Sequence, residues 1–433
     1  MAPSMSFVAT GDSFVTRRLA ASPGVPELAA IIRNAEARFT NFEVLTPGDD
    51  GFPSAVSGGT WANAPAGVIG DLKDLGFNLI GWANNHTLDY SYGGLAATAR
   101  ELDRYGMVHA GVGRNLAEAN RPRYLECPSG RVALIAVTST FHESAAAGQQ
   151  RPDQLGRPGV NPLRFTTTYL LPRDRLEALT GIADAAGVND GHKVRVKDGF
   201  ADALEPDVVL FGNHRFKEAE TAGCRTEPKA ADVARIVAAI GEARRQADFC
   251  LVSLHAHEMA GIDKTVPAEF LRSFAHSCIE AGAHAVIGHG PHVLRGIEIF
   301  LMRPIFYSLG NFIFQNETVE NLLPDFYEKF ELGLTENTAD ALDKRSAVNT
   351  RGFAVNPWAW KSVVARFTIE NDALTALELH PVELGFGQSR PRRGTPTLAN
   401  DPTILQHLTE LSAPFGTRIV TERNVGRVVL ARD

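Results

Sequence analysis

The chain has 433 residues, of which 44% are hydrophobic and 21% charged, a balance ordinary for a globular protein with a large buried core. Its net charge of −7, without any run of lysine or arginine, argues against a nucleic-acid partner. No apolar stretch approaches the ~20 residues that cross a bilayer, and the N-terminus resembles no leader. We therefore expect a cytoplasmic protein that does not act at a membrane.

Short apolar runs alternate with amphipathic helical patterns between residues 6 and 315, which predicts an α/β fold. We expect strands at 6–10, 39–43, 77–83, 131–138, 207–211, 249–254, 284–288 and 304–314. We expect helices at 26–38, 93–105, 229–247 and 267–281. The last of these places Phe270, Phe274 and Cys278 at four-residue spacing, as a buried helix face requires.

Two stretches depart from this alternation. Residues 143–205 are rich in Gly, Pro, Gln, Arg and Asp, and residues 315–352 are polar. Both are interpreted as insertions in a domain that covers residues 1–390, and such insertions often carry substrate specificity. Residues 391–433 are expected to form a C-terminal extension packed on that domain.

Five apolar runs end in side chains that bind metals or carry protons. These side chains are Asp12, Glu43, the Asn84–His86 run, His255 with His257 and Glu258, and His289 with His292. Taken singly, each has an ordinary alternative: a turn cap, a solvated strand end or a satisfied core histidine. Because ligands bind beyond the carboxyl ends of strands in α/β sheets, five such ends in one chain favour an active site.

The run from Asn85 to Asp89 carries the sharpest signal. An amide beside an imidazole at a strand end suits metal coordination next to proton transfer, and Asp89 can orient His86. A local hydrogen-bonded turn is the alternative. His255 and His257 alternate along a strand, so at most one is expected to face the site, and His257 is expected to be structural or to support a ligand. Gly212-Asn213-His214 repeats part of the pattern and is expected at the edge of the pocket.

Several motifs together resemble the CapA/PgsA family, which is named for poly-γ-glutamate capsule synthesis. They are Gly11-Asp12, Asn41-Phe42-Glu43, Asn84 to Asp89, Gly93-Gly94, Gly111 to Asn115, Gly288 to Val293 and Tyr307 to Phe312. The resemblance covers roughly residues 6–315. It implies a calcineurin-like metallophosphoesterase fold, a sandwich of two mixed β-sheets flanked by helices. It also implies metal ligands at Asp12, Glu43, Asn85, His255, His289 and His292.

The chain departs from the metallophosphoesterase pattern in three places. Asp12 is not followed by the histidine of an Asp-x-His motif, Glu43 replaces the bridging aspartate, and residue 290, commonly histidine in the family, is glycine. Fewer nitrogen and more oxygen ligands favour a hard divalent cation such as Ca, Mg or Mn over Zn or Fe. They also weaken the case for a tightly bridged two-metal centre.

The resemblance extends to a cytoplasmic branch of peptide epimerases, which invert the Cα centre of the C-terminal residue in lasso-peptide precursors. Our first hypothesis is accordingly a metal-dependent peptide epimerase, with a peptide substrate. His86, oriented by Asp89, is one proton carrier, and His292 or His255, supported by Asp12, is the other. The alternative is a metal-dependent hydrolase of phosphoester or poly-γ-glutamate bonds, and a polymer-binding scaffold is a third possibility. The oligomeric state is left open.

Overall fold

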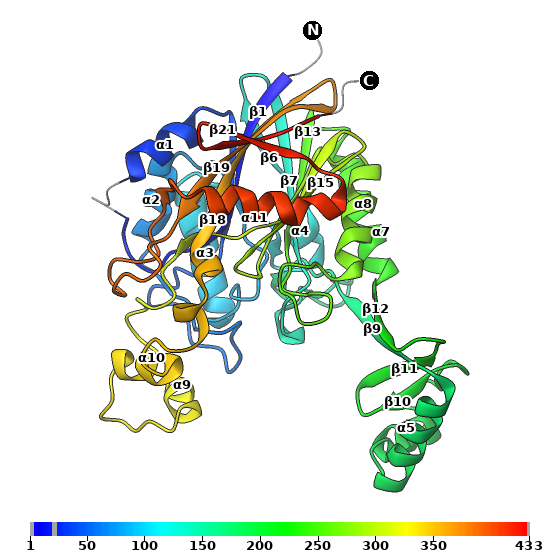
Figure 1. Ribbon diagram of the computed structural model, residues 1–433. Coiled ribbons are helices and arrows are strands. Elements are labelled where there is room, and N and C mark those ends of the chain that lie inside the picture. The colour runs from blue at the N-terminus through cyan, green and yellow to red at the C-terminus, as the bar shows by residue number, and fades with distance from the viewer. Residues whose placement is uncertain (1–3, 20–23, 431–433) are drawn as a thin grey trace.

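The computed structural model describes residues 4–19 and 24–430 (Figure 1). Two large β-sheets pack against each other, and helices cover their outer faces, so the predicted α/β sandwich is confirmed. Within the described ranges, no helix is long and apolar enough to cross a membrane.

The first sheet has the strand order β21-β22-β19-β18-β1-β2-β3-β4. Its strands are β1 (Ser4–Phe14), β2 (Ala37–Phe42), β3 (Leu79–Gly81), β4 (Val108–Ala110), β18 (Lys361–Glu370), β19 (Ala373–Glu383), β21 (Ile419–Glu422) and β22 (Val425–Val428). β17 (Asn311–Phe314) pairs with the end of β1, and β20 (Thr397–Leu398) pairs with β19. Strands β1 to β4 run parallel, so their carboxyl ends share one edge.

The second sheet has the order β15-β16-β14-β13-β7-β6. Its strands are β6 (Arg123–Cys127), β7 (Gly130–Thr138), β13 (Phe249–His255), β14 (Ala285–His289), β15 (Leu294–Phe300) and β16 (Arg303–Leu309). β7, β13, β14 and β16 are parallel. The register of β13 and β14 places His255 directly beside His289 at the carboxyl edge.

Apolar side chains from both sheets form the central core, with Phe7 and Phe39 from the first sheet against Leu134, Leu251 and Ile287 from the second. Helices α1 (Val25–Arg33), α2 (Gly67–Leu75) and α3 (Ser91–Arg104) cover the outer face of the first sheet. Helices α7 (Ala230–Ala243) and α8 (Glu269–Glu280) cover the second. Smaller elements are α4 (Leu116–Asn120), β5 (Val112–Gly113) and β8 (Gly159–Val160).

Two projections leave this body, as Figure 1 shows at its lower right and lower left. The first is built from β9 (Phe165–Leu171), α5 (Arg173–Ala186), α6 (Asp190–Lys197), β10 (Val209–Phe211), β11 (His214–Glu218) and β12 (Gly223–Pro228), which has its own four-stranded sheet. The second carries α9 (Pro324–Lys329) and α10 (Thr338–Ser346). Beyond residue 391 the chain returns to the body through β20, α11 (Pro402–Ser412), β21 and β22.

Three expected elements differ from the structure in their bounds or in the sheet that they join. The helix expected at 26–38 ends at Arg33, because the chain turns at Asn34 and enters β2 at Ala37. The single strand expected at 304–314 is two strands in different sheets, separated by Gly310, whose φ of 70° turns the chain out of extended conformation. The strand expected at 207–211 belongs to the projecting sheet, where only residues 209–211 pair.

Candidate metal centre

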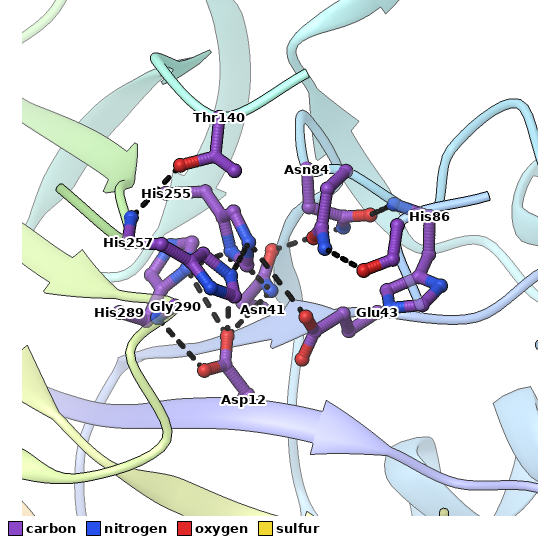
Figure 2. A network of polar contacts seen from close by, with 12 residues as sticks. Asp12, Asn41, Glu43, Asn84, His86, Thr140, His255, His257, His289 and Gly290 are labelled. Atoms are coloured by element: carbon purple, nitrogen blue, oxygen red, sulfur yellow. Dashed lines mark hydrogen bonds and ion pairs between the residues drawn. The ribbon is translucent and has the colours of Figure 1, made fainter. Parts of the chain in front are cut away.

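The carboxyl ends of strands from both sheets bring six potential metal-binding side chains together. Figure 2 labels all of them except His292. They form two groups, which are Asp12 with His255 and His289, and Glu43 with His257 and His292; within each group the ligand atoms lie within 4.8 Å of one another. The groups adjoin, since His255 Nε2 lies 3.1 Å from His257 Nε2. We call them the Asp12 group and the Glu43 group. Each can hold one metal ion.

Close backbone packing directs Asp12 into the site. A Cβ atom on Gly11 would lie 1.8 Å from the carbonyl oxygen of Gly310, so only glycine fits there. The Asp12 N–H donates to that same oxygen at 2.9 Å. On the other side, the N–H of Gly290, at a φ of 121°, donates to Asp12 Oδ2 at 2.8 Å. The glycine that departs from the family pattern therefore supports the ligand.

Asp12 is fully buried, but neighbouring side chains offset the cost of burying its charge. Its Oδ1 lies 3.2 Å from His289 Nδ1 and 3.6 Å from His255 Nδ1, and it accepts a hydrogen bond from Asn41 Nδ2 at 2.8 Å. Burial by itself raises the pKa of Asp12, but the hydrogen bonds and charges of His255 and His289 outweigh it and hold that pKa well below its usual value. Asp12 is thus ionised and ready to bind a cation.

Glu43 has much less compensation, since its closest ion-pair contact is His255 Nε2, 3.6 Å from Oε1. It is fully buried, and across residues 4–19 and 24–430 neither of its carboxyl oxygens has a hydrogen-bond partner. Burial, and then the charges of Asp12 and Asp89, raise the pKa of Glu43 well above its usual value. A buried polar group without a partner is costly, and a divalent cation would supply the missing partner. The residues present therefore fit a metal ion at the Glu43 group.

The expectation that at most one of His255 and His257 faces the site was wrong. Residues two apart on a strand point to the same face, and although β13 ends at His255, both imidazoles point into the cluster. The His257 N–H donates to Thr140 Oγ1 at 2.8 Å, which fixes its backbone. Burial lowers the pKa of His255 to about 4 and that of His257 well below its usual value. Both are neutral, as metal ligands must be.

His86 and Asp89 form a buried pair beside the two groups. His86 Nδ1 lies 2.7 Å from Asp89 Oδ2, which also accepts the Ala62 N–H at 2.9 Å. Because the carboxylate can only accept, the imidazole carries its proton on Nδ1, and Nε2 is left to take or give a proton.

His292 is held in a similar way by Asn311, which lies in the Tyr307–Phe312 motif but was given no role from the sequence. His292 Nδ1 lies 2.8 Å from Asn311 Oδ1, and Asn311 Nδ2 donates to the carbonyl of Ala359 at 2.8 Å. That second bond orients the amide, so His292 also carries its proton on Nδ1 and presents Nε2. His292 adopts a φ of 59°, a left-handed conformation that is uncommon outside glycine and concentrates at functional sites.

Asn85, an expected ligand, is not gathered into either group. Its amide donates to the carbonyl of Gly58 at 3.2 Å, whereas the neighbouring Asn84 donates to the Phe42 carbonyl at 2.8 Å and lies in the network of Figure 2. A ligand role for Asn85 stays a prediction. His214 lies in the projecting sheet, exposed, so the expectation that it borders the pocket was wrong.

Two cavities open beside the centre. One, of about 320 Å³, is lined by His257, by Asn85 and Leu88, and by residues 140–142 and 144–145. The other, of about 690 Å³, shares Phe141, His142 and Ser144 with the first and extends to Arg157. Phe141, His142 and Ser144 therefore form a wall common to both, and only the smaller cavity is lined by a residue of the two groups, His257.

The fold is thus a two-sheet α/β sandwich whose strand ends gather two groups of histidine and carboxylate side chains that could hold metal ions. Residues 6–316 match the sequence model of the bacterial capsule synthesis protein PGA_cap, and the chain belongs to that family, as predicted. It is 36% identical to the uncharacterized protein y4sH of Sinorhizobium fredii over 98% of this chain and 93% of that protein. It is 24% identical to the capsule biosynthesis protein CapA of Bacillus anthracis, over 56% of this chain and 41% of CapA. It is 25% identical to the PGA biosynthesis protein CapA of Bacillus subtilis, over 56% of this chain and 44% of that protein.

Proposed function

We propose that this protein is a metal-dependent hydrolase that acts on a phosphoester or a poly-γ-glutamate bond. The observation that carries the proposal is the adjacency of the Asp12 and Glu43 groups, whose nearest imidazole nitrogens are 3.1 Å apart. Paired divalent ions activate water as a nucleophile and offset the charge that develops on the substrate. The name of one relative, the PGA biosynthesis protein CapA of Bacillus subtilis, supports the choice of a poly-γ-glutamate substrate.

The donor set bears on the identity of the metal. The sequence favoured a hard cation such as Ca, Mg or Mn, but His257 brings the imidazoles to four beside two carboxylates. Mixed nitrogen and oxygen ligands favour Mn, Fe or Zn. Mn is the ion that suits both interpretations, so it is the first to test.

His86 is the proton carrier of this reaction. Its Nε2 donates a proton to the oxygen or nitrogen of the departing group, and Asp89, 2.7 Å from Nδ1, stabilises the imidazolium that precedes this step. Because both residues are buried, the proton moves in a site largely closed to bulk water.

Peptide epimerisation, our first hypothesis from the sequence, is the second candidate, and one observation favours it. His86 Nδ1 is held by Asp89 and His292 Nδ1 by Asn311, so both imidazoles present Nε2. Removal and return of a Cα proton on opposite faces requires two such proton carriers. In this case His292 is not a ligand, so the protein holds one ion.

Metal content and turnover together test the two candidates. Hydrolysis predicts two ions per chain and turnover of p-nitrophenyl phosphate, bis-p-nitrophenyl phosphate or poly-γ-glutamate that His86→Gln reduces. Epimerisation predicts one ion, and incorporation of deuterium at Cα in D₂O when peptides encoded beside this gene are supplied. One ion with no hydrolysis of any of the three substrates would refute the hydrolase; no Cα exchange in those peptides would refute the epimerase.

A further inference from the structure

Arg295 lies wholly inside the protein on β15, three residues after His292. All of its hydrogen bonds go to backbone carbonyls of one segment, which are those of Lys264 at 2.8 Å, Glu258 at 2.9 Å, His257 at 3.3 Å and Ala256 at 3.4 Å. Burial lowers the pKa of Arg295 to about 10, so the guanidinium is still charged at neutral pH. A buried cation of this kind strongly favours the arrangement of carbonyls around it.

The segment that Arg295 binds, residues 256–264, is irregular and carries His257. β13 ends at His255, and beyond it the segment keeps only scattered main-chain contacts, among them the Ala256 N–H to the His289 carbonyl at 2.9 Å and an isolated bridge between Met259 and Pro267. The planar guanidinium presents its N–H groups in a fixed fork, and it reaches both the start of the segment, at Ala256, and its far end, at Lys264. A lysine, with a single flexible ammonium group, cannot span both ends.

The opposite side of the segment is fastened to the cavity wall. The Glu258 carboxylate accepts from Ser139 Oγ at 2.6 Å and from Thr140 Oγ1 at 2.9 Å. Thr140 Oγ1 in turn accepts the His257 N–H at 2.8 Å. The backbone of His257 is therefore clamped between Arg295 on one side and Thr140 on the other.

We propose that Arg295 is a positioning residue that holds His257 in the Glu43 group and so sets the affinity of the ion bound there. It does so through the backbone of residues 256–264, without contact to the ion. The inference rests on the proposed function in one respect, since it requires that the Glu43 group binds an ion. Nothing in it requires a particular substrate.

The test compares Arg295→Lys with a matched control, Arg303→Lys. Arg303 begins β16, at the end of the strand away from the site, and also donates to backbone carbonyls, those of Ile279, Ala283 and Asp372. In Mn²⁺ titrations followed by calorimetry and electron paramagnetic resonance, we expect Arg295→Lys to keep the first ion and to bind the second about 10–100-fold more weakly. Hydrogen exchange of residues 256–264 is expected to accelerate in Arg295→Lys alone.

Each outcome decides the matter. The inference is overturned if Arg295→Lys binds both ions with wild-type affinity. It is also overturned if Arg303→Lys loses the second ion as well. If the wild-type chain binds fewer than two ions, both the two-ion hydrolase and the role of Arg295 in metal affinity are overturned. If hydrogen exchange of residues 256–264 is unchanged in Arg295→Lys, Arg295 does not hold this segment in place. If Arg295→Lys does not fold, Arg295→Gln, which keeps two N–H donors, is measured in its place.

Discussion

Replacing Glu43 by methionine should make the metal-free protein more stable while it abolishes one ion site. Glu43 is fully buried, and neither oxygen has a hydrogen-bond partner in the described chain. Methionine has a similar size and no polar oxygens to leave unpaired. The carboxylate is thus predicted to be retained for the ion at a cost to the stability of the ion-free fold.

The magnitudes follow from the two environments. An unpartnered buried polar group costs about 1–3 kcal/mol, so metal-free Glu43→Met should gain that amount in the free energy of unfolding. An ion that binds only the folded state adds about 2.7 kcal/mol at a free concentration 100 times its Kd. The wild type, with two ions, should gain about 5 kcal/mol on loading, and Glu43→Met about half of that.

Urea unfolding with EDTA and with Mn²⁺ measures both quantities. Glu298→Met is the matched control, because Glu298 is also buried but accepts from Tyr307 Oη at 2.6 Å and Arg272 Nη2 at 2.9 Å. That variant should be less stable by about 1–3 kcal/mol and should keep the full gain from Mn²⁺. The reasoning fails if metal-free Glu43→Met is less stable than the wild type, or if its gain from Mn²⁺ equals that of the wild type.

Three further predictions concern pH, proton transfer and packing. His255 has a pKa of about 4 in the folded state and 6.5 in the unfolded state, so the unfolded state takes up the proton first as the pH falls. Without metal, the free energy of unfolding should therefore fall by about 3 kcal/mol between pH 6.5 and 4. The explanation is contradicted if the urea midpoint of His255→Asn depends on pH as strongly as that of the wild type. His86→Gln should lower turnover about 10²–10⁴-fold with an unchanged ion count, and wild-type turnover would exclude His86 as proton carrier. A Cβ on Gly288 would lie 2.5 Å from the Phe306 carbonyl oxygen, so Gly288→Ala should destabilise the folded protein. Gly241 on α7 has open space around it, so Gly241→Ala should stabilise the folded protein by about 0.5–1 kcal/mol. Thermal melts in which Gly288→Ala is more stable than Gly241→Ala would refute the packing argument.

Much of the site could be predicted because it follows directly from strand ends. His255 and His289 end β13 and β14, Asp12 follows an apolar run two residues before the end of β1, and in parallel strands such positions meet at one edge. The close pairing of His86 with Asp89 was equally accessible, because their three-residue spacing fits a single turn. The family motifs then supplied the sandwich that brings the two sheets together.

The rest could not be predicted, because it depends on what happens after the strands end. His257 follows β13, where the period of two no longer tells which way a side chain points. Gly310 divides an apolar run between two sheets, and the run itself carries no sign of the division except that glycine. Asn311 and Arg295 act through partners that no spacing rule connects to them, such as Ala359 and Lys264.

The two carboxylates of the centre differ in a way that orders the binding of ions. Asp12 is ionised through its contacts with His255 and His289, whereas burial and then the charge of Asp12 push the pKa of Glu43 well upward. An ion in the Asp12 group offsets the Asp12 charge and removes one cause of the Glu43 shift. The Asp12 group should therefore load first and ease the loading of the Glu43 group.

Because Glu43 must lose its proton to bind, the second ion should be bound with proton release, and its affinity should rise with pH more steeply than that of the first. Calorimetric titration with Mn²⁺ in two buffers of different ionisation enthalpy measures the protons released at each step. If both ions release the same number of protons, Glu43 is already ionised before the second ion binds. The same conclusion follows if the affinity for the second ion falls no more steeply than that for the first as the pH is lowered. The asymmetry between Asp12 and Glu43 would then have no consequence for how the centre fills.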